Sequence, residues 1–280
     1  LTAGSLTVTG AVYDYANPAV STASVAFGNV HVGDVLGAQT LSVTNLAKSN
    51  AAYQDALAIT ASSGNGKVTV TGAGTLAAGN AAQTLTLTPS VAAAGSLAGN
   101  LTLGLTSTAK AGTNLDNLAF ADSIVAITGA AYDYAKPGYS TATLDFGNVR
   151  VGASPAAQTV AFTNAPVTDA NYQEGLKVVA TGAAGKFTAS GFDSLAAGAG
   201  TANVTVSALT AAAGSLDGNV ALALTSLAKA GSNLTDSNLT AGSLTVTGAV
   251  YDYANPAVST ASVAFGNVHV GDVLGAQTLS

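Results

Sequence analysis

An unchanged internal repeat constrains this chain more than any other feature. Residues 1–42 recur letter for letter as residues 239–280, a shift of 238 positions. A diverged copy lies halfway, where the hexapeptide YDYANP that begins at Tyr13 returns as YDYAKP at Tyr132, a shift of 119. Two unlike units of 119 residues therefore form a super-repeat. That pattern is typical of a tandem array and not of a chain built around one active site.

The repeat also predicts how the chain divides into domains. A unit of 119 residues lies within the usual size range of one domain. We expect the closing strand of a preceding domain over 1–17, one domain over 18–136, a second over 137–255, and the opening strands of a following domain over 256–280. Because the chain starts and stops inside units, we expect it to be a window from a longer array.

Composition narrows the classes of partner. Charged residues make up 8% of the chain, against about 25% in an average soluble protein, so the surface relies on Thr, Ser, Asn and Gly. The net charge is −6, and the eight Lys and Arg residues are scattered, which argues against nucleic acid and anionic lipid as partners. With no run of about eighteen apolar residues, we expect no membrane insertion in this segment. The chain contains no Cys, which excludes disulfides and thiolate chemistry.

The local period of hydrophobicity is two. Segments such as 5–10, 67–72 and 84–89 alternate aliphatic residues with Thr and end on Gly or Pro, as half-buried antiparallel strands do. We predict strands near 21–28, 39–45, 56–61, 66–72, 82–88, 99–107 and 118–131, with equivalents 119 residues later. The stretch 105–117 suits either a helical turn or a crossing loop. The predicted fold class is all-β, with tandem immunoglobulin-like β-sandwich domains in a 119-residue repeat.

Between the predicted sandwiches, each unit carries a Tyr-Asp-Tyr triplet followed closely by Pro. Proline fixes φ and disfavours helix, and no flexible Gly/Ser-rich linker is present. We therefore predict a short, stiff interdomain junction that recurs along the chain. Its residues are Tyr13, Tyr15 and Pro18, then Tyr132, Tyr134 and Pro137, then Tyr251, Tyr253 and Pro256.

The opening of each unit resembles a known family. The sequence VAFGNVHVG at 25–33 with AQTLSVTN at 38–45, and LDFGNVRVG at 144–152 with AQTVAFTN at 157–164, are similar to the start of ASH-type immunoglobulin-like domains. Bacterial choice-of-anchor D surface proteins carry such domains in tandem. The resemblance implies a seven- or eight-stranded sandwich that serves as a spacer or interaction module. It carries over no catalytic residues.

The two histidines offer little support for catalysis. His31 and His269 occupy the same position one super-repeat apart, and the middle unit has Arg150 there. A catalytic base held in fixed geometry would not alternate in this way, so we expect a solvent-facing hairpin residue. We predict no catalytic residues, no cofactor and no enzyme activity.

Two weaker sites follow from acidic and aromatic residues. Asp14, Asp133 and Asp252 recur in every junction and are candidate calcium ligands, although Ca²⁺ needs about six to eight oxygens; the alternative is that each caps a turn. Tyr53 and Tyr172 each precede an amide and an acid, Gln54-Asp55 and Gln173-Glu174. Such a trio suits stacking on a sugar, and the alternative is a Tyr packed over the sandwich edge.

These patterns predict the structural repeat region of a large secreted or surface-attached bacterial protein, located outside the cell or at its surface. We expect the sandwiches to associate end to end with neighbouring copies, in tandem or by donated strands, into a semi-rigid stalk, fibre or matrix filament. The alternative is an adhesin module that recognises a glycan or a surface protein through an exposed Tyr-containing face.

Overall fold

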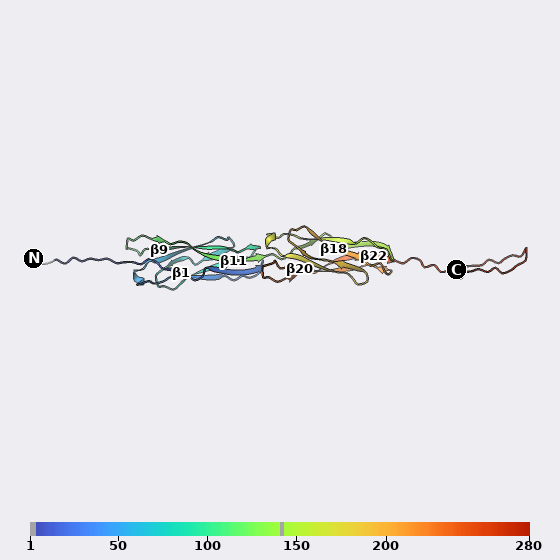
Figure 1. Ribbon diagram of the computed structural model, residues 1–280, viewed down its shortest axis with the longest axis horizontal. Helices are drawn as coiled ribbons and strands as arrows, with labels where there is room; N and C mark the ends of the chain where they lie inside the picture. The colour runs from blue at the N-terminus through green and yellow to red at the C-terminus, as the bar shows by residue number, and fades with distance from the viewer. Residues whose placement is uncertain (1–3, 141–142) are drawn as a thin grey trace.

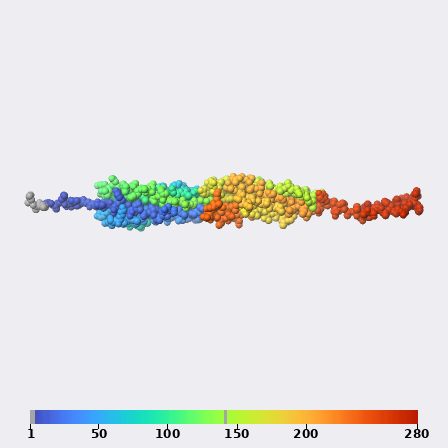
Figure 2. All heavy atoms as spheres, in the orientation of Figure 1, coloured from blue at the N-terminus to red at the C-terminus, as the bar shows by residue number. Residues whose placement is uncertain are grey.

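The computed structural model describes residues 4–140 and 143–280, which contain two β-sandwiches placed end to end (Figure 1). Strands β1 to β11 build the first sandwich and strands β12 to β22 build the second. All atoms together form a narrow, elongated body, and the blue and red segments at the two ends of the colour scale extend from it on opposite sides (Figure 2). The predicted all-β, immunoglobulin-like sandwich class is confirmed.

In the first sandwich, one sheet has the order β1-β3-β7-β5 and the other has the order β2-β11-β9-β4-β6. The short strands β8 and β10 pair at the margins with β11 and β9. The elements are β1 (Pro18–Val20), β2 (Ser24–His31), β3 (Gln39–Asn45), the 3-10 turn η1 (Ala51–Tyr53), β4 (Ala56–Ser63), β5 (Val68–Thr71), β6 (Gly74–Leu76), β7 (Gln83–Pro89), β8 (Gly95–Ser96), β9 (Gly99–Thr108), β10 (Leu118–Ala119) and β11 (Ser123–Tyr132).

The second sandwich repeats this topology with the sheets β12-β14-β18-β16 and β13-β22-β20-β15-β17. Its strand bounds fall 119 residues after those of the first to within one residue. The elements are β12 (Pro137–Tyr139), β13 (Thr143–Arg150), β14 (Gln158–Asn164), η2 (Ala170–Tyr172), β15 (Gly175–Thr181), β16 (Phe187–Ser190), β17 (Phe192–Leu195), β18 (Thr201–Ala208), β19 (Gly214–Ser215), β20 (Gly218–Leu227), β21 (Ser237–Asn238) and β22 (Gly242–Tyr251).

Alternation of side chains explains the two-layer core. In β9, Leu101, Leu103 and Leu105 point inward and are buried, while Thr102 and Gly104 between them lie nearer the solvent. Facing strands of the other sheet contribute Leu41, Val43, Leu85 and Leu87 to the same cluster. A period of two therefore buries one face of each sheet, which is what drives the sheets together.

The first and last long strands of each sandwich lie side by side. β2 pairs parallel with β11, and β13 pairs parallel with β22. Each pair shifts register at a glycine with positive φ, Gly129 (141°) in the first sandwich and Gly248 (146°) in the second. A Cβ on Gly129 would lie 2.6 Å from the Gly28 carbonyl oxygen. Glycine is therefore required for the two strands to approach here.

Several predicted strand limits were wrong in an instructive way. The predicted opening strand 21–28 is placed too early, because residues 21–23 carry the chain from β1 in one sheet to β2 in the other, and β2 spans Ser24–His31. The strand after 72 was missed, since the chain crosses again and forms β6. The predicted closing strand 118–131 is β10 followed by β11, and residues 105–117 hold the end of β9 and then turns and loop. No described helix is long and apolar enough to cross a bilayer.

The segments outside the sandwiches behave differently from their copies inside. Residues 4–13 have the same sequence as β22, yet they form no strand, and Leu6, Val8 and Val12 are 85–92% exposed. In β22, the equivalent Leu244, Val246 and Val250 are buried. One sequence thus becomes a core strand only where partner strands cover it. Residues 256–280 repeat 18–42, and the Ser259–Ser280 backbone hydrogen bond copies that between Ser21 and Ser42.

Candidate functional site at the junction between the sandwiches

The linker between the sandwiches is hydrogen bonded along its length. β11 ends at Tyr132 and β12 begins at Pro137. Between them, the Asp133 amide donates to the Tyr172 carbonyl (2.8 Å), and the Glu174 amide donates to the Asp133 carbonyl (3.0 Å). The Ala135 amide donates to Ser226 Oγ at 2.7 Å. The linker is therefore bonded to the second sandwich, and it restricts the motion of the two sandwiches relative to each other.

Two buried side-chain amides, Asn164 and Gln173, bond each other and hold the linker in place. Asn164 Nδ2 donates to the carbonyls of Glu174 and Leu195, while its Oδ1 accepts from the Lys136 amide at 2.9 Å. Gln173 Nε2 donates to Asn164 Oδ1 at 3.2 Å. The first sandwich repeats this arrangement with Asn45 and Gln54. Fully bonded buried amides hold the backbone in one arrangement, because any other leaves them unpaired.

A buried contact between the sandwiches joins His31 to Glu174. His31 Nε2 donates to Glu174 Oε1 at 2.8 Å, and Ser226 Oγ donates to Glu174 Oε2 at 2.6 Å. The His31 ring stacks on Tyr134, with ring centroids 4.0 Å apart and planes inclined by 16°. His31 is 8% exposed, so the expectation of a solvent-facing hairpin residue was wrong. Its place at the end of β2 presents it to the next sandwich.

A second contact crosses the junction beside the first. Asn29 Nδ2 donates to the Ser232 carbonyl at 2.8 Å. Asn29 and His31 both lie near the end of β2, and Asp34 fixes this end because its Oδ2 accepts from the His31 amide at 2.9 Å. Asn29 and His31, both at the end of β2, thus bond two separate residues of the second sandwich, Ser232 and Glu174.

Arg150 occupies the His31 position at the far end of the second sandwich. Its Nη1 donates to the Asp252 carbonyl at 2.8 Å, and its guanidinium lies 5.3 Å from the centroid of the Tyr253 ring. Tyr253 is the counterpart of Tyr134, so both units place the side chain at this position over the same tyrosine. Arg150 itself is exposed.

Asp55 occupies the Glu174 position at the opposite end of the first sandwich. Ser107 Oγ donates to Asp55 Oδ2 at 2.9 Å and accepts from the Ala16 amide, as Ser226 does for Glu174 and Ala135. Asp55 is only 3% exposed, and its Oδ1 has no hydrogen-bond partner among the described residues. Asp55 borders a cavity of about 460 Å³ together with Tyr13, Tyr15, Leu115 and Asp116. We call this cavity the Asp55 socket.

The His31–Glu174 pair was missed in the sequence because its members lie 143 positions apart. A signal was nevertheless present. The position of His31 carries His, Arg and His along the chain, and all of these donate N–H bonds. The position of Glu174 carries Asp in the first unit and Glu in the second, and both are carboxylates. The first position thus carries a hydrogen-bond donor and the second a carboxylate in both units, as the His31–Glu174 contact requires.

The predicted tyrosines pack in pairs, one pair where the chain enters each sandwich. Tyr13 packs on Tyr53 at 5.5 Å between ring centroids, and Tyr132 packs on Tyr172 at 5.6 Å. Burial raises the pKa of Tyr132 above its usual value, and the Tyr172 hydroxyl raises it further. Gln54 and Asp55 are buried, as are Gln173 and Glu174, so only the tyrosine of each proposed sugar-binding trio reaches the surface.

The other predicted junction residues begin strands, accept hydrogen bonds from neighbouring side chains, or are exposed to solvent. Pro18 and Pro137 are the first residues of β1 and β12. Asp14 accepts from Ser49 Oγ at 2.8 Å and Asp133 accepts from Thr168 Oγ1 at 2.6 Å. The described residues contain no group of three or more His, Asp or Glu placed to hold a metal. Calcium binding at Asp14, Asp133 and Asp252 stays a prediction, which melting with and without a chelator would test. The remaining members, Tyr251, Tyr253 and Pro256, are exposed.

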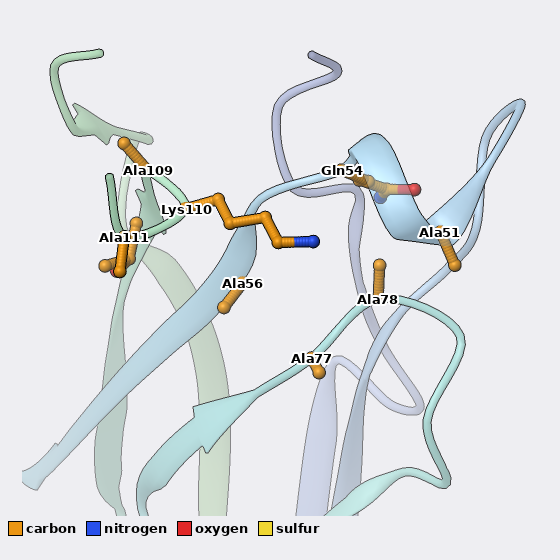
Figure 3. Close-up of a pocket in the computed structure, with 9 residues that line it drawn as sticks. Ala51, Gln54, Ala56, Ala77, Ala78, Ala109, Lys110 and Ala111 are labelled. Atoms are coloured by element: carbon orange, nitrogen blue, oxygen red, sulfur yellow. The ribbon is translucent and has the colours of Figure 1, made fainter. Parts of the chain in front are cut away.

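A smaller cavity of about 290 Å³ lies at the same end of the first sandwich (Figure 3). Alanines line most of it, and Lys110 extends across it toward the turn that carries Ala51 (Figure 3). Lys110 Nζ donates to the Ala52 carbonyl at 2.7 Å. The cavity recurs in the second sandwich with Lys229 in the same place. Its lysine is used to tie two loops together, which is a structural role.

Comparisons with known proteins do not decide the function. No protein-family model matches the chain, and no curated protein matches it. Among solved structures, a protein of unknown function from Porphyromonas gingivalis W83 aligns with 14% identity and a TM-score of 0.32, over 83% of this chain and 99% of that one. The D00-D0 domain of intimin aligns with 15% identity and a TM-score of 0.33, over 81% and 99%.

The adhesive subunit CfaE of an Escherichia coli fimbria aligns with 10% identity and a TM-score of 0.39, over 85% of this chain and 88% of that one. At such identities and scores, these likenesses support no argument about what this chain does. The resemblance to ASH-type domains stays a prediction. The function is therefore argued from the junction itself.

Proposed function

We propose that this chain is a structural spacer, the tandem-repeat region of a large secreted or surface-attached bacterial protein. In this proposal its sandwiches form a semi-rigid stalk or fibre that holds other parts of the protein at a distance. The observation that carries the proposal is the junction, where a four-residue linker (133–136), a buried His31–Glu174 pair and a ring stack join two sandwiches end to end.

The pairing of the terminal strands supports a mechanical role. The chain enters the first sandwich at β1 and leaves it from the end of β11 at the opposite pole, and β12 and β22 take these places in the second sandwich (Figure 1). Tension along the rod therefore pulls β2 and β11 past each other lengthwise. Six registered residue pairs, from Ala126–Ser24 to Tyr132–His31, resist this sliding together. Hydrogen bonds loaded together resist force better than bonds opened one at a time, so the topology suits a load-bearing spacer.

Residues 4–13 support a continuing array. They are an exposed copy of β22 whose apolar side chains are buried only when β13 and β20 flank them. Strands of an adjoining unit, in tandem or donated from another copy, would supply that cover. In the proposed array, each such segment closes the sandwich before it.

Small-angle X-ray scattering on arrays of two, four and six units tests the proposal. We expect the maximum dimension to rise linearly with the number of units. A maximum dimension that levels off would show that the units fold back on one another and would overturn the proposal. The double variant His31→Ala, Glu174→Ala should bend the array, while Lys136→Ala serves as the matched control, because Lys136 is exposed in the same linker.

A binding module is the second candidate, and the exposed ring of Tyr53 is the observation in its favour. The neighbouring amide and acid are buried, which removes two of its three proposed contact groups. A glycan array probed with the native chain and with Tyr53→Ala, Tyr172→Ala would decide: binding that the double variant abolishes supports this candidate, and no binding by the native chain removes it.

A further inference from the structure

We propose that the Asp55 socket receives the arginine end of another sandwich, so that His–Glu and Arg–Asp junctions alternate along the array. The occupant is the end of a unit of the Arg150 type, with its guanidinium on Asp55. This inference rests on the proposed rod and deepens it, because it names the chemical rule by which one unit selects the next.

The unpaired oxygen of Asp55 is the first argument. At the junction that the structure shows, both carboxylate oxygens of Glu174 are bonded, one within its own sandwich to Ser226 and one across the junction to His31. At Asp55 the internal bond to Ser107 is present, and the oxygen that corresponds to the cross-junction contact has no partner among the described residues. A buried carboxylate oxygen without a donor is costly. A donor from a neighbouring unit satisfies it.

The lining of the socket is the second argument. Tyr15 and Leu115 border it, and the counterpart positions in the second sandwich are Tyr134, which stacks on His31 at the formed junction, and Leu234. Thr113 is half-buried, whereas its counterpart Ser232, which accepts from Asn29, is 1% exposed. Leu115 is exposed and Leu234 is half-buried. The differences in burial follow the presence of a docked neighbour, so the socket is the same surface in its undocked form.

The side-chain lengths identify the occupant as arginine. Asp is one methylene shorter than Glu, so a side chain that reaches Asp55 must extend further than His31 does. Arg150 provides that reach, and it already lies over Tyr253 as His31 lies over Tyr134. A guanidinium also binds a carboxylate and stacks on an aromatic ring at once, which lysine does less well.

The repeat supplies the matching order. The sequence that follows Arg150's sandwich, 256–280, is identical to 18–42, the opening of the sandwich that contains Asp55. Arg150 therefore faces a unit that begins as the Asp55 unit does. Asp145, also at the outer face of β13, bonds Thr247 of its own sandwich, and Asp252 offers its carbonyl to Arg150. Among the described residues, no carboxylate oxygen is paired with the Arg150 guanidinium.

The rule gives the array its register. His31 opposite an aspartate would fall short of the carboxylate, and Arg150 opposite a glutamate would overreach it. Correct pairs are therefore the two that alternate in the sequence, and like units do not follow each other. This explains why the repeat that recurs unchanged has 238 residues and not 119.

An exchange of pairs at the formed junction tests the rule in the existing chain. Because the chain contains no Cys, spin labels on Ser62→Cys and Thr181→Cys, one in each sandwich, report the distance between them cleanly. We expect a narrow distance distribution in the otherwise native chain. His31→Arg alone and Glu174→Asp alone should each broaden it, and the double variant should restore the narrow peak. A double variant as broad as the broader single variant would overturn the rule.

The first sandwich shows that an aspartate at the Glu174 position is compatible with the fold. Asp at the Glu174 position keeps its internal serine contact, as Asp55 and Ser107 show. Each variant should therefore stay folded at the temperature of the distance measurement, and its unfolding midpoint checks this.

A lengthened chain tests the Asp55 socket directly. Residues 43–132 added after Ser280 complete a third sandwich with its own copy of Asp55. With labels on Thr181 and on the third copy of Ser62, we expect Arg150→Gln, or Asp55→Asn in the third copy, to broaden this second junction and leave the first unchanged. An unchanged distribution in both variants would overturn the proposal, as would a distribution that responds to calcium or chelator and not to Arg150→Gln. A native chain that is broad at both junctions would instead overturn the proposed rod.

Discussion

The same carboxylate position has two environments in this molecule. In the second sandwich, Glu174 bonds Ser226 inside its own body and His31 across the junction. In the first sandwich, Asp55 bonds Ser107 and leaves its other oxygen without a partner in the described chain. The folds around them are the same to within one residue. The difference therefore comes from docking and not from folding, and it shows which part of each sandwich is an interface.

Glu174 should contribute more to the free energy of unfolding than Asp55 does. We expect Glu174→Ala to destabilise the chain by about 3 kcal/mol, because it leaves two buried donors without an acceptor. Asp55→Ala should cost about 1 kcal/mol, because it removes one serine contact and also removes an unsatisfied oxygen. Urea unfolding of both variants measures the difference, and equal losses would contradict the comparison.

His31 and Arg150 provide the next contrast. We expect His31→Ala to cost about 2 kcal/mol, since it removes a hydrogen bond to a buried carboxylate. Arg150→Ala should change stability by less than about 0.5 kcal/mol in this chain, because the side chain is exposed and bonds only a surface carbonyl. Thermal melting of the two variants would contradict this if Arg150→Ala were the more harmful.

Tyr134, at the formed junction, should contribute more to stability than Tyr15, at the Asp55 socket, and both contributions should be smaller than that of Glu174. Tyr134→Ala should cost about 1 kcal/mol, because the ring stacks on His31 across the junction. Its counterpart Tyr15 lines the Asp55 socket and carries no such partner among the described residues, so Tyr15→Ala should cost less. Differential scanning calorimetry of both variants makes the comparison, and a larger effect at Tyr15 would show that stacking is not the cause.

The smallest effect concerns alkaline pH. Burial, and then the nearby Tyr172, raise the pKa of Tyr132 above its usual value of 10.0. The folded chain then holds this proton more tightly than the unfolded chain does. The resulting stability is complete below pH 10.0 and is lost as pH rises through the folded-state pKa. Unfolding midpoints measured from pH 8 to pH 11 should decline less steeply in Tyr132→Phe, and an identical decline in both proteins would exclude this origin.

Sequence patterns predicted the sandwich more completely than its contacts. Alternation of Leu or Val with Thr marks strands such as β7 and β9, because one face is buried in each. The crossing of the chain from β1 to β2 was not predictable in this way, since β1 has only three residues and the two strands pair with different partners, β3 and β11. His31 was assigned to solvent because its local sequence resembles a hairpin. Its burial depends on Glu174 and Tyr134 in another sandwich, which no local pattern contains.

Residual dipolar couplings of the intact chain in a weakly aligning medium test the central claim most directly. Backbone amides of β2 to β11 report the orientation of the first sandwich, and those of β13 to β22 report that of the second. If the His31–Glu174 junction fixes the two bodies, one alignment tensor will fit both sets with the orientation that the structure shows. Two tensors of different magnitude would mean that the sandwiches turn independently, and would contradict a semi-rigid rod.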